Sequence, residues 1–351
     1  MEDATSKPIR VVQWATGNIG ARALRGVIEH PRLSLAGVYV YGPEKEGRDA
    51  GELCGGSPAG PTGVVATRDV EQILALGADC VLYMPRACDF DEVCRLLASG
   101  ANVVTTRGEF HRPAHLDPET RRRVEAACEA GQSSIHSTGS SPGFITEAVP
   151  LVLSSIQRRL DHLVIDEFAD LSQRNSPELL FDIMGFGKDP AAFDAHRFAF
   201  GRDSFGPSLE LVAEAMAMPL DDVVSTGEVA TAASATEIAA GALPSGTVAA
   251  QRMVVSGLRG GEPALVFRAT WYCTTDLEPA WTLGDTGWHV SVDGDAPLEV
   301  DIRLAVPLER MAAMSPAFTA NRAVNAVPVV CAARPGIRTT VELPHIIPVL
   351  A

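Results

Sequence analysis

Residues 9–20 read IRVVQWATGNIG and place a glycine-containing turn between two apolar patterns. The pattern before the turn is typical of a buried strand, and apolar residues recur at helical spacing after it. This order is the context of a dinucleotide fingerprint, in which backbone N–H groups at a helix N-terminus face a pyrophosphate. The residues expected to contact the nucleotide are Thr16, Gly17, Asn18, Ile19 and Gly20. Trp14 replaces the first glycine of the G-x-x-G-x-x-G pattern, so an ordinary tight turn is the alternative.

The composition of the 351-residue chain is that of a globular protein, with 46% apolar and 21% charged residues. The net charge of −15 disfavours nucleic acid and anionic membranes as partners, because both need a basic surface. No apolar run is long enough to cross a bilayer, and residues 1–4 lack the pattern of a signal peptide, so a cytoplasmic location is expected. The seven cysteines form no C-x-x-C pair and predict neither a disulfide framework nor a metal site.

The first 140 residues alternate between short apolar strands and helical patterns. The expected strands are 10–14, 35–41, 80–84, 102–105 and 133–137, and the expected helices are 20–29, 70–76, 91–98 and 118–130. This alternation predicts an α/β domain, residues 1–141, built on a doubly wound parallel sheet. Ligands bind beyond the carboxyl ends of the strands in such sheets, which makes Met84 and Pro85 at the end of the third strand candidate cofactor contacts.

The pattern changes after Ser141-Pro142-Gly143. Strands are then expected at 163–170, 223–230, 248–256, 264–274, 288–292 and 298–306, with helices among residues 145–215. They predict a second, α+β domain, residues 142–315, with a largely antiparallel sheet and helices on one face. Apolar positions in residues 316–331 predict a C-terminal helix, and residues 316–351 are expected to pack back toward the first domain.

The end of the second expected strand bears on the choice of nucleotide. NAD-binding domains usually carry Asp or Glu there to hold the ribose 2′-OH, whereas this strand ends at Tyr41. Lys45, one of only three lysines, and Arg48 follow, and cations at this place neutralise a 2′-phosphate. The sequence therefore predicts that NADP(H) is preferred, with NAD(H) possible, and Tyr41, Lys45 and Arg48 are candidate cofactor contacts. The alternative is that these cations are solvated loop charges beside Glu44 and Glu46.

Glu109 is the candidate catalytic residue. It follows the strand expected to end at Thr105, and a carboxylate there can pass protons at an imine or carbonyl carbon during hydride transfer. The alternative is a carboxylate that caps a helix or forms a surface salt bridge.

Residues 137–144, STGSSPGF, follow the fifth expected strand and open a helix. Ser141 and Pro142 in this segment are candidate cofactor contacts, because hydroxyl and N–H groups here can hold the nicotinamide carboxamide. The alternative is a capped turn between domains. Three nearby histidines are expected to be structural, since no spacing suggests a metal ligand set: His111, His115 and His136.

Five blocks of the chain resemble the dihydrodipicolinate-reductase-like group, and within it the branch of 2,4-diaminopentanoate dehydrogenase and the native NADPH-dependent amine dehydrogenases. These blocks are residues 11–20, 47–53, 141–144, 182–187 and 319–328. The resemblance covers nearly the whole chain. It implies an N-terminal Rossmann domain, a second domain that supplies the contact of a homodimer, and an active site in the cleft between the domains.

The resemblance also implies an activity, the reversible oxidative deamination of an amine by NAD(P)+ to give a ketone or aldehyde, ammonia and NAD(P)H. A glutamate conserved in the family falls on Glu109. The chain lacks the paired histidines and following lysine of true dihydrodipicolinate reductases, which argues against their reaction.

The substrate pocket is expected to involve Phe144, Phe168, Arg174, Met184 and Asn321. Apolar walls would exclude water and favour an imine. Arg174 either selects a carboxylate-bearing or polar substrate or is a surface arginine. Two other functions stay open, namely reduction of a preformed cyclic imine or an activated C=C bond, and a sensor that binds NADP(H) without turnover.

Overall fold

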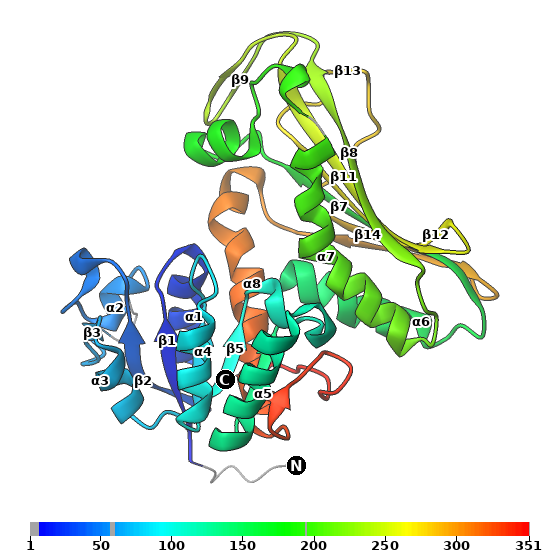
Figure 1. Ribbon diagram of the computed structural model, residues 1–351. Coiled ribbons are helices and arrows are strands. Elements are labelled where there is room, and N and C mark those ends of the chain that lie inside the picture. Colours follow the sequence, from blue (N-terminus) through cyan, green and yellow to red (C-terminus); the bar gives the residue numbers. More distant parts are fainter. Residues whose placement is uncertain (1–6, 57–59, 194, 351) are drawn as a thin grey trace. The chain divides into compact units, whose positions relative to one another are not determined.

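The computed structural model describes residues 7–56, 60–193 and 195–350. The chain forms two compact units, which are described separately (Figure 1). The first unit comprises residues up to Phe144 together with residues from Pro316 onward, and the second comprises Ile145–Ser315. The first unit is therefore assembled from two separate segments of the chain.

The first unit contains a parallel sheet that has seven strands within the described residues. Its order is β16-β6-β5-β4-β1-β2-β3, and every pairing is parallel. The strands are β1 (Ile9–Trp14), β2 (Leu33–Tyr39), β3 (Ala66–Thr67), β4 (Cys80–Tyr83), β5 (Asn102–Thr105), β6 (Ser134–Ser137) and β16 (Gly336–Ile337). Strand order reverses between β1 and β4, where such sheets bind ligands. The predicted doubly wound parallel sheet is confirmed.

Helices cover both faces of this sheet. Successive residues of a strand point to opposite faces, so neighbouring residues pack against different helices. Val12 and Val103 pack in one cluster with residues of α3 (Val70–Ala75), α4 (Phe90–Ala98) and α5 (Pro118–Gly131). Their sequence neighbours Val11 and Val104 pack in another cluster with α1 (Asn18–Glu29) and α8 (Leu308–Cys331). Alternation along each strand thus fixes which helices lie on which face.

Several boundaries differ from the sequence prediction. β2 is Leu33–Tyr39 rather than 35–41, so Tyr41 lies beyond the strand. β3 and β16 were not predicted, because two-residue strands carry no measurable periodicity. α8 begins at Leu308 instead of residue 316, and its internal Pro316 was wrongly interpreted as a helix start.

The second unit contains a sheet in which seven strands fall within the described part of the chain, in the order β13-β8-β11-β12-β7-β14-β15. The strands are β7 (Leu160–Asp170), β8 (Asp222–Ala232), β11 (Val248–Arg259), β12 (Glu262–Tyr272), β13 (Leu277–Glu278), β14 (Gly287–Gly294) and β15 (Leu298–Arg303). Pairings are antiparallel apart from the parallel β12–β7 pair in the residues described, which confirms the predicted largely antiparallel sheet.

The long helix α7 (Ala195–Ala215) packs on β8, β11 and β12, where Phe205 stacks on Phe267 with ring centroids 4.2 Å apart. The unit also contains α6 (Val149–Ser154), the irregular turns η5 (Glu178–Met184) and η6 (Pro190–Ala192), and a small hairpin of β9 (Thr236–Ile238) and β10 (Gly241–Leu243). Across the described residues, no helix has the length and apolar character that a membrane span requires.

Candidate functional site

The glycine turn connects β1 to α1 and leaves no room for a side chain at Gly20. A Cβ atom there would lie 2.2 Å from the carbonyl oxygen of Ala15, which accepts a hydrogen bond of 2.8 Å from Gln13 Nε2. Gly17 is different, because a Cβ atom there would meet nothing within 4 Å. Gly20 therefore allows the tight turn, and Gly17 leaves open space above it.

The N-terminus of α1 lacks a side-chain cap among the described residues. The helices α2 (Ala50–Leu53), α3, α4 and α5 each begin after an aspartate whose carboxylate accepts from their first-turn N–H groups. Beside the uncapped turn, Thr16 Oγ1 is buried and has no hydrogen-bond partner within the described chain. A helix N-terminus attracts anions, so the uncapped turn and the buried hydroxyl fit a pyrophosphate.

Trp14, which occupies the first glycine position of the fingerprint, is fully buried in the core. Its indole stacks on Tyr39 with centroids 3.9 Å apart, and its N–H donates to Tyr41 Oη at 3.0 Å. Tyr41 and Tyr83 both donate to Glu92 Oε2, at 2.8 and 3.0 Å. Burial raises the pKa of both tyrosines, so they remain hydrogen-bond donors. The indole thus connects the turn to a network beyond β2.

The two cations predicted from the sequence lie in different surroundings. Lys45, in η1 (Pro43–Lys45), donates from Nζ to the carbonyl oxygen of Thr16 at 3.0 Å. Arg48 donates from Nε to Glu52 at 3.3 Å, and both side chains of this pair are about half exposed. Lys45 therefore contacts the glycine turn, whereas Arg48 forms a surface ion pair.

A third cation, Arg68, was not predicted from the sequence. It follows β3 and donates from Nε to the carbonyl oxygen of Tyr41 at 3.0 Å. The missing signal was β3 itself, because the parallel β2–β3 pairing brings Arg68 beside the end of β2. Once that pairing is known, the residue after β3 becomes a candidate for nucleotide contact.

The end of β4 borders a hollow of about 740 Å³. Tyr41, Pro85 and Arg86 contribute to its lining, and Met84 is buried directly before it. This volume lies in the range of ligand pockets, which is about 300–1,000 Å³. The hollow thus places Pro85 and Tyr41, both predicted cofactor contacts, around one space.

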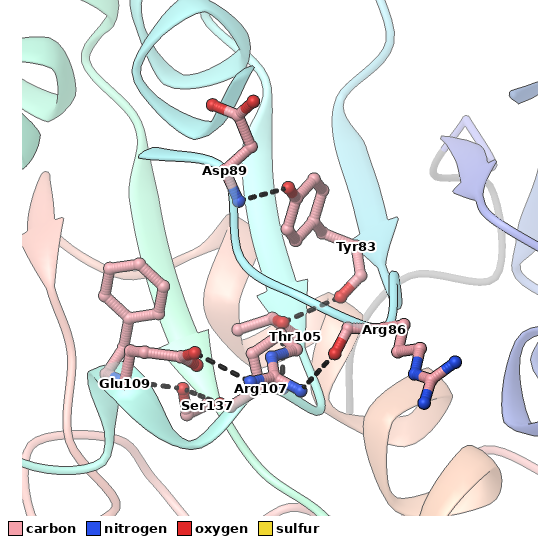
Figure 2. A network of polar contacts seen from close by, with 8 residues as sticks. Tyr83, Arg86, Asp89, Thr105, Arg107, Glu109 and Ser137 are labelled. Atoms are coloured by element: carbon pink, nitrogen blue, oxygen red, sulfur yellow. Dashed lines mark hydrogen bonds and ion pairs between the residues drawn. The ribbon is translucent and has the colours of Figure 1, made fainter. Parts of the chain in front are cut away.

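Glu109 lies in η2 (Gly108–Phe110), directly beyond β5, and Figure 2 shows its carboxylate turned toward Arg107. Arg107 Nη2 donates to Glu109 Oε1 at 2.8 Å, and Arg107 Nη1 donates to the carbonyl oxygen of Arg86 at 2.9 Å. The second carboxylate oxygen, Oε2, is buried and has no partner within the described residues. One carboxylate oxygen is therefore held by a cation, whereas the other makes no hydrogen bond among the described residues.

The backbone around Glu109 is fixed by hydroxyl groups from two strands (Figure 2). Ser137 Oγ at the end of β6 donates to the carbonyl oxygen of Arg107 at 2.7 Å and accepts from the Phe110 N–H at 3.2 Å. Thr105 Oγ1 accepts from the Arg107 N–H at 3.0 Å and donates to the carbonyl oxygen of Tyr83 at 2.7 Å. These bonds tie the turn that carries Glu109 to three neighbouring strands.

Cys88 is a thiol whose titration is affected by Glu109. Burial, followed by the negative charge of Glu109, raises the pKa of Cys88 to about 12. The thiolate is the nucleophilic form of cysteine. Cys88 is therefore a neutral thiol near pH 7 and does not compete with Glu109 for a chemical role.

The segment Ser140–Ala148 (η4) follows β6 and carries further polar groups. Thr138 Oγ1 and Ser141 Oγ are buried without hydrogen-bond partners in the part of the chain described. Ser140 Oγ lies 2.7 Å from Thr319 Oγ1, which joins this segment to α8. Two buried hydroxyls without partners fit a ligand that has its own donors and acceptors, such as a carboxamide.

The remaining predicted residues near η4 are more exposed to solvent. Pro142 and Phe144 are partly exposed, and the Phe144 ring centroid lies 5.8 Å from the guanidinium carbon of Arg322. Asn321 is exposed on α8. The first unit thus contains the predicted cofactor residues, Glu109, Phe144 and Asn321, whereas Phe168, Arg174 and Met184 belong to the second.

In the second unit, Met184 lines an apolar chamber of about 370 Å³ together with Met253 and Trp271. Neither Phe168 nor Arg174 is among its lining residues. Phe168 lies on β7, and Arg174 follows that strand with a half-buried guanidinium. Its Nε is buried and has no hydrogen-bond partner among the residues described, and burial lowers the pKa of this side chain.

Comparison with known proteins agrees with this architecture. The family model of the 2,4-diaminopentanoate dehydrogenase C-terminal domain matches residues 144–350. An amine dehydrogenase from Streptomyces virginiae is 30% identical over 352 residues, which covers 96% of this chain and 96% of that protein. A 4-hydroxy-tetrahydrodipicolinate reductase from Synechococcus elongatus is 26% identical over 176 residues, 48% of this chain and 60% of that protein. The solved structure of an amine dehydrogenase from Mycobacterium smegmatis shares the fold, with a TM-score of 0.75, 19% identity and 96% coverage of each chain.

Proposed function

This chain belongs to the family of the 2,4-diaminopentanoate dehydrogenase C-terminal domain, and on that premise we propose that it is an NAD(P)H-dependent amine dehydrogenase. The observation that carries the proposal is the 30% identity to an amine dehydrogenase along 96% of both chains. The reaction is the reductive amination of a ketone or aldehyde with ammonia, or its reverse. The relation to the group that the sequence resembles is confirmed by the same matches.

Two features of the first unit fit two parts of one bound pyridine nucleotide. The uncapped turn of Thr16–Gly20 would hold the pyrophosphate, and the buried hydroxyls of Thr138 and Ser141 would hold the carboxamide. We assign NADP(H) as the preferred cofactor, because the segment that follows β2 carries Tyr41 in place of a carboxylate. When bound, the nicotinamide ring supplies the hydrogen and two electrons that reduce the substrate.

We assign proton transfer to Glu109. In the direction of amination, Oε2 accepts a proton from an ammonium ion, and the ammonia so formed adds to the substrate carbonyl carbon. The resulting carbinolamine loses its hydroxyl group as water when Glu109 returns the proton. The carboxylate then stabilises the iminium cation by its negative charge. Arg107 holds Oε1 throughout, which leaves Oε2 as the oxygen that exchanges the proton.

We assign substrate contacts to Phe144, Phe168, Arg174, Met184 and Asn321. The chamber beside Met184 supports an apolar substituent on the substrate. The half-buried Arg174 instead supports a carboxylate or another polar group on the substrate, because an anionic partner stabilises a desolvated cation. We further propose that residues 1–141 bind the nucleotide and that residues 142–315 bind substrate and form the contact of a homodimer.

The proposal is tested by oxidation of NADPH with a panel of ketones and aldehydes, each with and without ammonium at about pH 9, where free ammonia is plentiful. Ammonium-dependent oxidation on any member establishes amine dehydrogenase activity. Oxidation on cyclic imines that is independent of ammonium replaces the proposal by an imine reductase. Binding of NADPH without turnover on either panel replaces it by a nucleotide sensor.

Glu109→Gln tests the assigned role. We expect unchanged cofactor binding and a loss of at least ~100-fold in kcat, the lower end of the contribution of a general base. Glu125→Gln is the matched control, because Glu125 also pairs with an arginine at 2.8 Å but lies on the surface of α5. Turnover of Glu109→Gln close to that of Glu125→Gln would remove Glu109 from the mechanism.

A further inference from the structure

Three cations follow the strands at the β2–β3 edge, and their partners distinguish them. Lys45 binds the carbonyl oxygen of Thr16, so its ammonium supports the glycine turn itself. Arg48 is paired with Glu52 along a helical turn at the surface. Arg68 is held by a backbone carbonyl at the end of β2, through Nε alone. Arg48 and Arg68 both donate through Nε, and they differ in the partner, which is an exposed acid for Arg48 and the backbone carbonyl of Tyr41 for Arg68.

The anchoring of Arg68 fixes where its guanidinium fork lies. Because Nε donates to the Tyr41 carbonyl at 3.0 Å, the guanidinium lies at the residue where NAD-binding domains place their carboxylate. The fork forms an ion pair with Glu46, whose Oε2 is 3.8 Å from Nη1, and both side chains are nearly half exposed. An exposed pair at that distance contributes little, so a phosphate can displace Glu46.

The carboxylate of Glu92 is held by two tyrosine hydroxyl groups. Its Oε2 accepts hydrogen bonds from the hydroxyl groups of both Tyr41 and Tyr83. The hollow that Tyr41 lines carries the cations Arg86 and Arg123 and the acids Asp89, Asp91 and Glu92, and Arg68 is not among its lining residues.

We infer that Arg68 is the residue that selects NADP over NAD, by binding the 2′-phosphate through its two Nη groups. The inference rests on the proposed function and names a specificity residue for its cofactor site. A guanidinium fork matches two phosphate oxygens, which a ribose hydroxyl cannot supply. Lys45 adds a point charge, whereas Arg48 takes no part.

The test is calorimetric titration of the whole protein with NADP+, NAD+ and 2′,5′-ADP, which needs no turnover. Arg68→Ala is expected to raise the Kd of NADP+ and 2′,5′-ADP about 10- to 100-fold, the cost of losing charge-assisted hydrogen bonds. The Kd of NAD+ should stay within about twofold. Arg68→Lys keeps the charge but loses the fork, so its Kd for NADP+ should fall between those of the wild type and Arg68→Ala.

Arg95→Ala is the matched control, because Arg95 is a similarly exposed arginine that pairs with a single acid, Glu71. Its three Kd values should equal those of the wild type. Equal losses for NAD+ and NADP+ in Arg68→Ala would overturn the inference and indicate stacking on the adenine. A selective loss in Arg48→Ala or Arg86→Ala, with none in Arg68→Ala, would also overturn it. A wild type that binds neither nucleotide would refute the proposed function itself.

Discussion

Replacing Arg107 by methionine should lower kcat and leave the KM for NADPH nearly unchanged. Among the described residues, the Arg107 side chain donates to Glu109 Oε1 at 2.8 Å and to the Arg86 carbonyl oxygen at 2.9 Å, and neither residue is a predicted cofactor contact. Methionine keeps the apolar stem of the side chain and removes the guanidinium. Glu109 would then lose the group that orients it, while the hydroxyl bonds around its backbone stay in place. Arg107 is thus a positioning residue in the proposed reaction.

The size of the effect follows from the exposure of the pair. The side chains of Arg107 and Glu109 are 32% and 27% exposed, so the pair is mostly but not fully shielded from water. Exposed ion pairs contribute about 0–1 kcal/mol, and hydrogen bonds to charged groups contribute about 1.5–3 kcal/mol. An intermediate value of about 1–2 kcal/mol corresponds to a decrease of about 5- to 30-fold in kcat.

The assay is steady-state reductive amination with saturating ammonium, in which kcat and the KM for NADPH are measured separately. Arg107→Lys should recover part of the rate, because an ammonium can donate to Glu109 but cannot also reach the Arg86 carbonyl as a fork does. Arg121→Met is the control, since it removes a surface pair of the same length. A kcat for Arg107→Met within about twofold of the Arg121→Met value would refute the reasoning.

Three further substitutions test the glycine turn. Gly20→Ala places a Cβ atom 2.2 Å from the Ala15 carbonyl oxygen and should lower the free energy of unfolding by about 1–3 kcal/mol, whereas Gly17→Ala should leave stability unchanged in denaturant titrations. Trp14→Gly, which restores the usual fingerprint, should cost about 3–5 kcal/mol or more, because it empties a fully buried site stacked on Tyr39. A Trp14→Gly protein as stable as the wild type in calorimetry would show that the indole is not a core residue.

The parts of the fold that sequence predicts well are those whose signal is local. β1, β4 and β5 are each short apolar runs between helical patterns, and the sequence ranges differ from the observed bounds by at most one residue. Helix α8 shows the opposite case. Its internal Pro316 suggested a boundary, yet the helix continues through it from Leu308, because tertiary packing outweighs a local preference.

The candidate site divides in the same way. The place of Glu109 after β5 follows from the strand pattern alone. Its hydrogen bonds do not, because Ser137 and the Arg86 carbonyl come from segments that only the sheet brings together. Arg68 was missed for the same reason, since its relation to Tyr41 depends on a two-residue strand. Contacts that depend on strand pairing between distant segments cannot be predicted from the spacing of residues in the sequence.

The division of the first unit between two segments of the chain has a consequence for its synthesis on the ribosome. When residue 144 emerges, the sheet still lacks β16 and the apolar residues of α8 that pack beside Val11 and Val104. The 171 residues of the second unit must be made first, which takes on the order of ten to thirty seconds. The part of this sheet face that α8 covers stays exposed during that interval. The unit that starts the chain is therefore the last to be completed, and nascent-chain chaperones would act on it.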